Sequence, residues 1–187
     1  MKLLLTGGAG YIGAHVAALA EREGHSVTIV DDLSTGIANR VPGPVVDINL
    51  ASPDSVEKLS RLMRDTEFDA VIHLAARKQV GQSVQIPEQY FLDNIGGLAN
   101  LLLAMRQEDQ QKLVFSSSAA TYGVPTLDLV DENYPGVPIN PYGQTKLAGE
   151  WMVKNAATWG LRGANLRYFN VAGSESKKLA EIGRAHV

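Results

Sequence analysis

Continuous apolar runs separated by longer amphipathic runs constrain this chain more than any other feature. The apolar runs are rich in Leu, Val and Ile, as expected of parallel strands that are covered on both faces. Strand–helix alternation of this kind predicts an α/β fold of Rossmann type, a doubly wound parallel sheet with helices on both faces. We expect strands at Lys2–Thr6, Ser26–Asp31, Pro44–Asp47, Ala70–Leu74, Leu113–Ser116 and Ala164–Tyr168, helices near residues 11–23, 53–64, 87–107 and 142–159, and a Gly- and Pro-rich loop at 123–140.

Composition excludes several classes of protein. A chain of 187 residues is long enough to bury a core without metal or disulfide staples. Its net charge of −3 argues against nucleic acid or an anionic membrane as the main partner. The absence of cysteine excludes a disulfide scaffold and fits a cytoplasmic location. Glycines interrupt the uncharged stretch Leu3–Ala20, so we expect neither a signal peptide nor a membrane span there. No His, Asp and Glu cluster has metal-ligand spacing, and we expect no metal.

A glycine-rich turn, Gly7–Gly13, follows the first predicted strand and opens the first predicted helix. Such glycines permit a tight turn, let backbone N–H groups approach a pyrophosphate, and let the helix pack on the sheet. Asp31 ends the next strand, 18 residues after Gly13, where a carboxylate can accept hydrogen bonds from the adenosine ribose hydroxyls. It would repel a 2′-phosphate, so we expect NAD rather than NADP. The alternative is a structural turn that binds no ligand.

Two further motifs carry candidate chemistry. Tyr142 and Lys146 are four residues apart on one predicted helix, which Asn140 caps and Pro141 begins. An ammonium group near a phenol favours the phenolate, so we expect Lys146 to lower the pKa of Tyr142 and make it a general base for an alcohol. Ser116–Ser118 end the fifth strand, where hydroxyls can hold a substrate oxygen. The alternative for Tyr142 and Lys146 is that their spacing arises by chance. The alternative for the serines is a turn in which their hydroxyls bond only to their own backbone.

Together these residues resemble a known family. The motifs are GGAGYIG at 7–13, Asp31, HLAA at 73–76, the serine triplet, YGQTK at 142–146 and LRYFN at 166–170. The set resembles the extended short-chain dehydrogenase/reductase family, and within it the enzymes that epimerise C4 of UDP-hexoses. The resemblance covers residues 1–174 and implies that they form an NAD-binding domain with catalytic Ser, Tyr and Lys. It implies that the family's small C-terminal substrate lobe is absent here.

The last residues fit the resemblance poorly. We interpret residues 175–187 as a truncated tail. The peptide IGRAHV at Ile182–Val187 is encoded by the start of a widely used sequencing adapter, so we interpret these residues as translated adapter. An ordinary loop is the alternative.

The resemblance assigns roles to individual residues. It implies that Tyr142 is the catalytic base, that Lys146 tunes it and bonds the nicotinamide ribose, and that Ser118 touches the reacting hydroxyl. The residues implied in NAD binding are Gly7, Gly10, Tyr11, Ile12, Gly13, Asp31, Asp32, Leu33, Ser34, Thr35, Gly36, Asp47, Ile48, Leu74, Ala75, Ala76, Lys78, Asp93, Ser116, Tyr142, Lys146 and Phe169. Those implied in substrate binding are Lys78, Ser118, Tyr142 and Asn170.

Two positions depart from the family pattern. Asp93 stands where the family commonly has the first of two asparagines, which puts the NAD contact at this position in doubt. Val171 stands where a proline often follows the Phe-Asn pair.

The implied reaction is a transient oxidation of a UDP-sugar. Tyr142 takes the proton of the 4-hydroxyl, the C4 hydride passes to NAD⁺, and hydride returns to the opposite face of the 4-keto sugar. Without the substrate lobe, we expect the chain to bind NAD but to be nearly inactive. A related sugar-nucleotide epimerase or decarboxylase and a non-enzymatic NAD-binding module remain alternatives. Dehydratases fit less well, because Ser118, Ala119 and Ala120 stand where they carry an Asp–Glu pair.

Partners follow from the same resemblance. It implies a UDP-sugar as the substrate and a homodimer through helices 87–107 and 142–159. Core packing of their apolar residues, such as Leu98 and Trp151, is the alternative.

Overall fold

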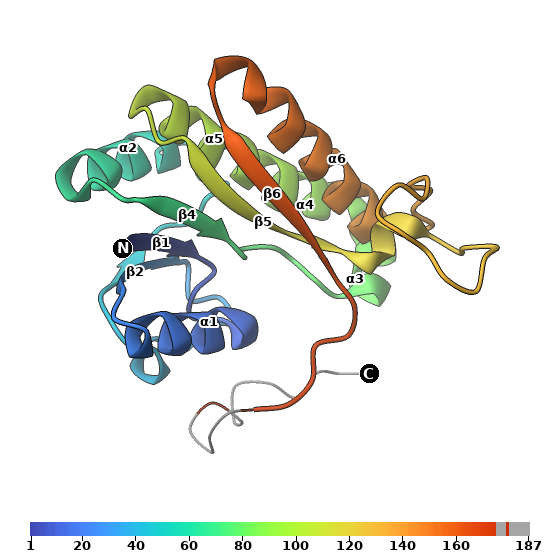
Figure 1. The fold of residues 1–187 in the computed structure, drawn as a ribbon, viewed down its shortest axis with the longest axis horizontal. Coiled ribbons are helices and arrows are strands. Elements are labelled where there is room, and N and C mark those ends of the chain that lie inside the picture. Colours follow the sequence, from blue (N-terminus) through green and yellow to red (C-terminus); the bar gives the residue numbers. More distant parts are fainter. Residues whose placement is uncertain (175–178, 180–187) are drawn as a thin grey trace.

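The computed structural model describes residues 1–174 and Leu179. Their strands form one parallel sheet in the order β3-β2-β1-β4-β5-β6, so the order reverses between β1 and β4 (Figure 1). The strands are β1 (Lys2–Thr6), β2 (Ser26–Asp31), β3 (Val45–Asp47), β4 (Ala70–His73), β5 (Lys112–Ser118) and β6 (Arg162–Tyr168). The Rossmann-type doubly wound fold predicted from the sequence is therefore confirmed. The tail predicted at 175–187, with the adapter peptide at 182–187, lies outside the described residues apart from Leu179.

Helices cover the two faces of the sheet unequally. One face carries α1 (Tyr11–Arg22), which lies over β1 and β2, and the opposite face carries most of the other helices (Figure 1). These are α2 (Ser55–Thr66), α5 (Gly97–Gln107) and α6 (Pro141–Asn155), while the short helices α3 (Val80–Gln85) and α4 (Pro87–Tyr90) follow β4. Between α4 and α5 the chain forms a π-helical segment, Phe91–Gly96. Single 3₁₀ turns lie at Ala38–Arg40, Ala119–Tyr122 and Ala156–Trp159.

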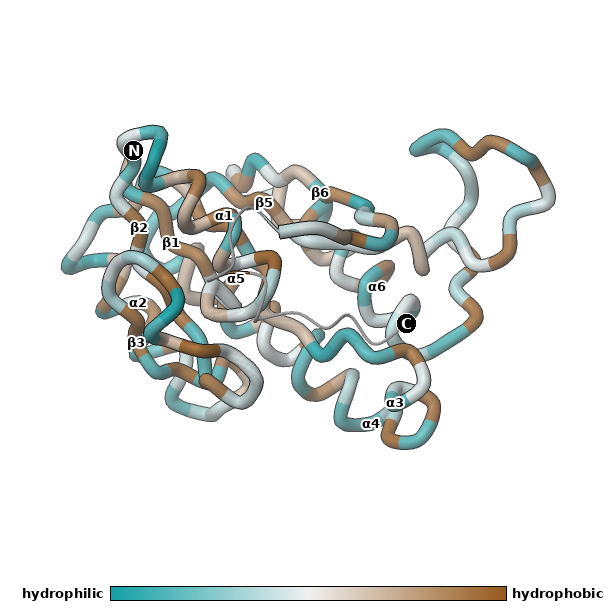
Figure 2. Tube along the Cα trace, turned by 90° about the horizontal axis from the view of Figure 1, so that it is seen from below, coloured by the Kyte–Doolittle hydropathy of each residue, from teal (hydrophilic) through white to brown (hydrophobic). Residues whose placement is uncertain are grey.

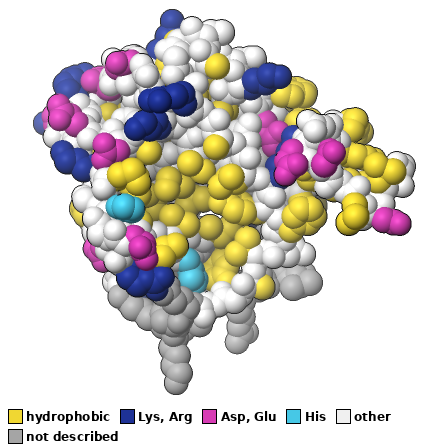
Figure 3. All heavy atoms as spheres, in the orientation of Figure 1, with side chains coloured by type: hydrophobic (Ala, Val, Ile, Leu, Met, Phe, Trp, Pro, Cys, Tyr) yellow, Lys and Arg dark blue, Asp and Glu magenta, His cyan; other side chains and the backbone are white. Residues whose placement is uncertain are grey.

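Alternation along the strands builds two apolar cores. Leu3 and Leu5 of β1 pack with α1, whereas Leu4 points to the larger core beneath α2, α5 and α6. On the α1 side, no helix of the described residues covers β5 and β6, and Leu166 is 40% exposed there. Hydrophobic side chains gather in the middle of the view that looks onto this side of the molecule (Figure 3).

The predicted elements agree with the structure except in a few places. The predicted helix at 87–107 is α4, the π segment and α5 in succession, and α3 precedes it without having been predicted. β5 runs to Ser118 rather than Ser116, because pairing with β6 continues through the serines. The helix predicted at 142–159 changes to a 3₁₀ turn after Asn155. The loop predicted at 123–140 is confirmed and projects from the body of the molecule (Figure 2).

The described residues contain neither a membrane-spanning helix nor a metal-binding cluster. None of their helices is both long enough and apolar enough to cross a lipid bilayer. Within the same residues, no group of three or more His, Asp or Glu side chains is placed to hold a metal ion.

Candidate active site

The candidate site lies at the carboxyl ends of β1, β4 and β5, where the strand order reverses and ligands of open α/β sheets bind. The glycine turn forms its floor. Gly7 has a φ of +71°, and a Cβ there would lie 2.4 Å from the backbone nitrogen of Ala75. A Cβ at Gly13 would lie 2.4 Å from the carbonyl oxygen of Gly7. The turn, α1 and the segment after β4 therefore pack backbone against backbone, which only glycine permits.

Asp31 is buried at the end of β2 and fixes the second side of the site. Its carboxylate accepts hydrogen bonds from the N–H groups of Ala9 at 2.9 Å and Leu33 at 3.0 Å. Burial raises the pKa of Asp31, and these two hydrogen bonds oppose the rise. Gly36 closes over the carboxylate, because a Cβ there would lie 2.7 Å from its Oδ1 atom. Asp31 thus ties the glycine turn to the turn that follows β2.

The remaining predicted residues of this half surround Asp31. Asp32 holds the same turn by accepting bonds from the N–H and hydroxyl of Ser34 at 3.0 and 2.6 Å. Asp47 pairs in register with Asp31, and the N–H of the buried Ile48 donates to the carbonyl of Asp31 at 3.4 Å. The structure therefore brings the predicted adenosine residues to one place: Asp31, Asp32, Leu33, Ser34, Thr35, Gly36, Asp47 and Ile48.

The segment after β4 forms the third side, and Asn94 holds it in place. Buried in the π segment, Asn94 accepts a bond from the N–H of Arg77 at 2.7 Å and donates to the carbonyl of Arg77 at 3.1 Å. It also donates to the hydroxyl of Thr145 on α6 at 3.0 Å. Asp93 forms an ion pair with Arg77 and accepts from Gln89 at 2.8 Å. Asp93 thus acts within the protein in this structure, and Asn94 is a residue that sequence reasoning missed.

Tyr142, Lys146 and Ser118 meet where α6 packs on the end of β5. Lys146 is buried, donates to the carbonyl of Ser116 at 2.8 Å, and lies 5.1 Å from the ring centroid of Phe115. Its Nζ atom is 6.0 Å from the ring centroid of Tyr142. The Ser118 side chain lies near enough to Tyr142 to influence its pKa, and it caps the following 3₁₀ turn by accepting from the N–H of Ala120 at 3.2 Å. The predicted catalytic trio is therefore assembled at one point.

The start of α6 explains why the trio meets. The side chain of Asn140 accepts a bond from the N–H of Gly143 at 2.8 Å, and Pro141 occupies the first helical position. Cβ atoms at Gly143 and Gly149 would lie 2.6 Å from the carbonyl of Ala120 and from the Phe115 ring, respectively. Both glycines let α6 approach β5 closely.

The pKa of Tyr142 corrects one expectation. We expected Lys146 to lower it, but burial raises the pKa of Tyr142, and the neighbouring Ser118 side chain opposes the rise only in part. Burial also lowers the pKa of Lys146 to about 8. Desolvation is the largest effect on Tyr142, and Lys146, whose Nζ atom lies 6.0 Å from the ring centroid, does not offset it.

His73 borders this trio from β4. It bonds the hydroxyl of Thr6 at 2.6 Å and stacks on Phe115 with ring centroids 5.7 Å apart. Burial, with a smaller effect of Lys146, lowers the pKa of His73 to about 3, so the ring is neutral at ordinary pH. These contacts fit a packing role.

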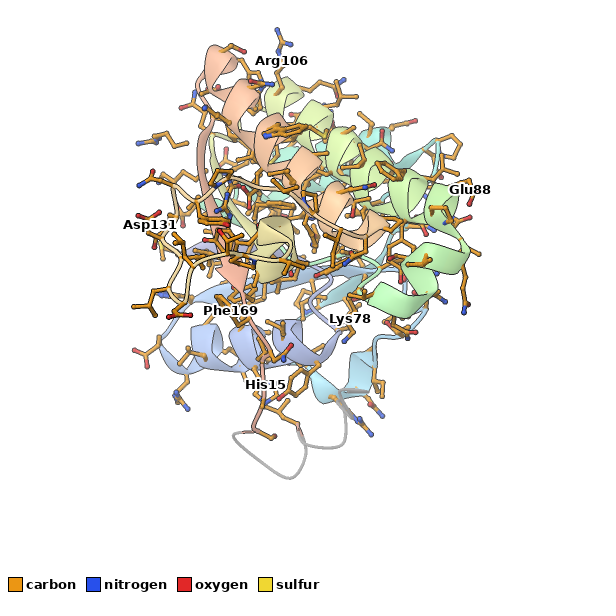
Figure 4. The ribbon with its side chains drawn as sticks, turned by 90° about the vertical axis from the view of Figure 1, so that its right-hand side faces the viewer. His15, Lys78, Glu88, Arg106, Asp131 and Phe169 are labelled. Carbon is orange, nitrogen blue, oxygen red and sulfur yellow. The ribbon has the colours of Figure 1, made fainter. Side chains whose placement is uncertain are left out.

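Other predicted residues lie at the margin of the site. Lys78 and Phe169 are exposed and lie between α1 and the opposite layer of helices (Figure 4), and Asn170 is exposed beyond β6. Tyr11 and Ile12 line a cavity of about 300 Å³ with residues 171–174, and the Tyr11 hydroxyl donates to the carbonyl of Gly173. Leu74 and Ala76 are half-buried on the segment beside the glycine turn.

The fold and the glycine turn define a Rossmann-type domain. Residues 3–185 match the family described as NAD dependent epimerase/dehydratase, and the chain belongs to that family. The prediction that the cofactor is NAD is confirmed at the level of the family, which is NAD dependent by its description.

Individual relatives point the same way. The chain is 45% identical over 175 residues to UDP-glucose 4-epimerase of Corynebacterium glutamicum, covering 93% of this chain and 52% of that protein. A structure of UDP-glucose 4-epimerase from Brucella ovis in complex with NAD has a TM-score of 0.90 at 41% identity, covering 93% of this chain and 53% of that one. A structure of UDP-glucose 4-epimerase from Stenotrophomonas maltophila with bound NAD and formylated UDP-arabinopyranose has a TM-score of 0.90 at 39% sequence identity. The match covers 96% of this chain and 56% of that one. The chain spans about half the length of these relatives.

Proposed function

We propose that this chain supplies the NAD-binding and catalytic half of an enzyme that epimerises C4 of a UDP-hexose, UDP-glucose or UDP-galactose. The observation that carries the proposal is the meeting of Tyr142, Lys146 and Ser118 beside the glycine turn. The identity to UDP-glucose 4-epimerases supports this choice over a non-enzymatic module.

The residues at the strand ends fit a dinucleotide. The absence of a Cβ at Gly7 and Gly13 lets the glycine turn pack on the segment after β4 and on the start of α1, which brings the first turn of α1 to the end of β1. The first N–H groups of α1 have no partners within the helix, and Gly10 offers no side-chain cap. They would hold the pyrophosphate. The Asp31 carboxylate, oriented by two N–H groups, keeps lone pairs for the ribose hydroxyls.

The chemistry of the chain's own residues concerns one proton. NAD supplies reversible hydride acceptance when it is bound. Tyr142 would move the proton of the sugar 4-hydroxyl, and Ser118 would hold that oxygen by a hydrogen bond. Taking that proton requires the phenolate form of Tyr142, and returning it to the sugar oxygen requires the phenol. Burial raises the pKa of Tyr142 and so favours the phenol, the form that returns the proton. We expect the sugar to pass through a 4-keto state and C4 to be inverted.

We expect the 187-residue chain itself to bind NAD and to turn over a UDP-sugar very slowly. It spans about half the length of its relatives, so part of the binding energy that orients a nucleotide sugar would come from elsewhere.

A thermal-shift titration with NAD⁺ and NADP⁺ tests the proposal. Ligands that bind only the folded state stabilise it by mass action, so NAD⁺ should raise the melting temperature and NADP⁺ should do so much less. The matched variant is Asp31→Asn, which keeps an acceptor and removes the charge that would repel a 2′-phosphate. In this variant the rise in melting temperature with NAD⁺ and the rise with NADP⁺ should be more nearly equal. A cooperative melt without any response to NAD⁺ would refute the proposal.

We also propose that the protein forms a homodimer through the outer faces of the π segment, α5 and α6. Leu92, Leu103 and Trp151 are 62%, 50% and 59% exposed on these elements. Exposed apolar side chains on neighbouring helices are typical of subunit interfaces. Leu103→Glu should convert dimer to monomer in light-scattering measurements. Leu129→Glu, on the projecting loop, should not. A monomeric wild type at high concentration would rule the dimer out.

A further inference from the structure

An ion pair between the buried Glu150 and the partly buried Arg167 joins the helix that carries Tyr142 and Lys146 to strand β6. Glu150 of α6 accepts two bonds from Arg167 of β6, one from Nε at 2.9 Å and one from a terminal nitrogen at 2.7 Å. Their side chains are only 8% and 19% exposed. A bidentate pair in such surroundings has a strict geometry, so it restricts how α6 can sit on the sheet.

Glu150 also contacts the strand that bears Ser118. Its carboxylate accepts a hydrogen bond from the hydroxyl of Ser117, which is buried on β5. Tyr142, Lys146 and Glu150 are spaced by four residues and share one face of α6. Successive turns of the helix therefore contact Ser118, the carbonyl of Ser116 and the hydroxyl of Ser117.

The apolar contacts of α6 do not by themselves fix its height along β5. Gly149 lies directly against the Phe115 ring, and such apolar packing has no directional preference. The charged bonds of Glu150 are directional, and they are made two turns beyond Tyr142 on the same face. A shift of α6 along its axis would break them and would move Tyr142 away from Ser118.

Arg167 carries the same restraint to the projecting loop. It donates to the carbonyl of Glu132 at 3.1 Å, and its guanidinium lies 4.6 Å from the ring centroid of Tyr122. Tyr122 in turn contacts the ring of Tyr134 edge to face at 6.3 Å. The start and the middle of the 123–140 loop are therefore attached to the Glu150–Arg167 pair.

We propose that Glu150 and Arg167 are positioning residues that set the height of α6 on β5, and with it the contact of Tyr142 with Ser118. The proposal rests on the proposed function, because it concerns the geometry of the proposed base. Neither residue touches the reacting atoms; both act through Tyr142 and Lys146. The position of the loop at 123–140 depends on the same ion pair, because Arg167 contacts Glu132 and Tyr122.

NMR of the intact chain with ¹³Cζ-labelled tyrosine tests the proposal. The Tyr142 signal is assigned with Tyr142→Phe, and Ser118→Ala provides the signal of Tyr142 without the neighbouring Ser118 hydroxyl. In Glu150→Gln the Tyr142 signal should move toward its position in Ser118→Ala. The affinity for NAD should fall about five-fold, because Lys146 moves with the helix. Arg167→Lys, which keeps the charge but not the two parallel bonds, should give a smaller movement.

A second variant covers the case in which Glu150→Gln does not fold. The double variant Glu150→Gln with Arg167→Met removes both charges and leaves no unpaired buried ion. Because the ion pair has no net charge, its removal changes the electrostatic potential at Tyr142 little. A moved Tyr142 signal in the double variant would therefore indicate that Tyr142 has changed position.

The matched control is the pair of Arg64 and Glu108, which joins α2 to the end of α5 with bonds of 2.6 and 3.1 Å. Arg64→Ala removes a bidentate pair far from α6 and should leave the Tyr142 signal unchanged. If the Glu150 variants lower the melting temperature yet leave the signal and the NAD affinity unchanged, the pair is merely structural and the proposal is wrong. If wild type does not bind NAD, the proposed function fails, while the Tyr142 signal still decides the positioning role.

Discussion

The two halves of the sheet build their parts of the site in different ways. The half with β1, β2 and β3 shapes its part from backbone: bare glycines, helical N–H groups and one carboxylate held by two N–H groups. The half with β4, β5 and β6 uses side chains from distant segments, among them Asn94, Lys146 and Glu150. A site made from backbone depends on local chain conformation, whereas one made from side chains depends on how whole elements pack.

The halves also treat charge differently. The Asp31 carboxylate gains two N–H hydrogen bonds that partly offset its burial. Lys146 is buried with one carbonyl as its hydrogen-bond acceptor, and burial lowers its pKa to about 8. The half with β4, β5 and β6 therefore holds the buried charge of Lys146 at a cost in stability.

The largest effect should come from breaking the backbone half. Gly7→Ala would place a Cβ 2.4 Å from the nitrogen of Ala75 at a φ of +71°. We expect it to lower the free energy of unfolding by about 4 kcal/mol and to abolish the thermal shift with NAD⁺. Gly24→Ala is the control, since Gly24 has a φ of +79° with nothing within 4 Å, and should lose only about 1 kcal/mol. If urea unfolding showed that Gly7→Ala and Gly24→Ala lose the same free energy of unfolding, the close packing of the glycine turn would be contradicted.

Acid should destabilise the half with β4, β5 and β6 through His73. Its pKa is about 3 when folded and near 6.5 when unfolded, so the unfolded chain binds more protons between these values. Stability is then full above pH 6.5 and falls as the pH drops, by about 3 kcal/mol at pH 4. Urea unfolding of His73→Gln should show a smaller loss from pH 7 to pH 4 than wild type. If wild type and His73→Gln lost the same free energy of unfolding between pH 7 and pH 4, groups other than His73 would be responsible for the acid sensitivity.

Removing the buried cation should stabilise the domain while harming the site. The folded pKa of Lys146 is about 8 against 10.5 unfolded, so the penalty is present below pH 8 and disappears as pH rises toward 10.5. At pH 7, Lys146→Met should raise the free energy of unfolding by about 2 kcal/mol, since the lost bond to Ser116 offsets part of the gain. NAD affinity should drop. The exposed Lys154→Met on the same helix should change neither quantity.

The smallest effect should come from Asp93, which stands where the resembled family has asparagine. Its ion pair with Arg77 is partly exposed, so Asp93→Asn should change stability by less than about 1 kcal/mol. We expect NAD affinity to stay within about three-fold, because Asn94 still holds the backbone of Arg77. Asp54→Asn, which removes the exposed pair with Lys58, is the control. A large loss of NAD affinity in titration calorimetry would show that Asp93 itself contacts the cofactor.

This difference between the halves explains how much could be predicted from the sequence. The positions of the strands and the glycine turn with Asp31 were predictable because local pattern determines them, whereas the limits of β5 depend on its pairing with β6. The shared face of Tyr142 and Lys146 followed from helical spacing alone. The hydrogen bonds of Asn94 to Arg77 and Thr145 were not predictable, because they depend on a π-helical segment that the sequence pattern does not reveal. The pair of Glu150 with Arg167 and the raised pKa of Tyr142 depend on burial, which spacing does not reveal.

Strand β6 has a consequence for the colloidal behaviour of the protein. All seven of its residues pair with β5 on one side, and in the part of the chain that the structure describes no strand lies on its other side. A long edge of this kind can accept a strand from another molecule. Repulsion between molecules is weakest where their net charge vanishes, near the isoelectric point of about 5.8. Concentrated solutions should therefore scatter most light near that pH and clear as the solution is made more alkaline.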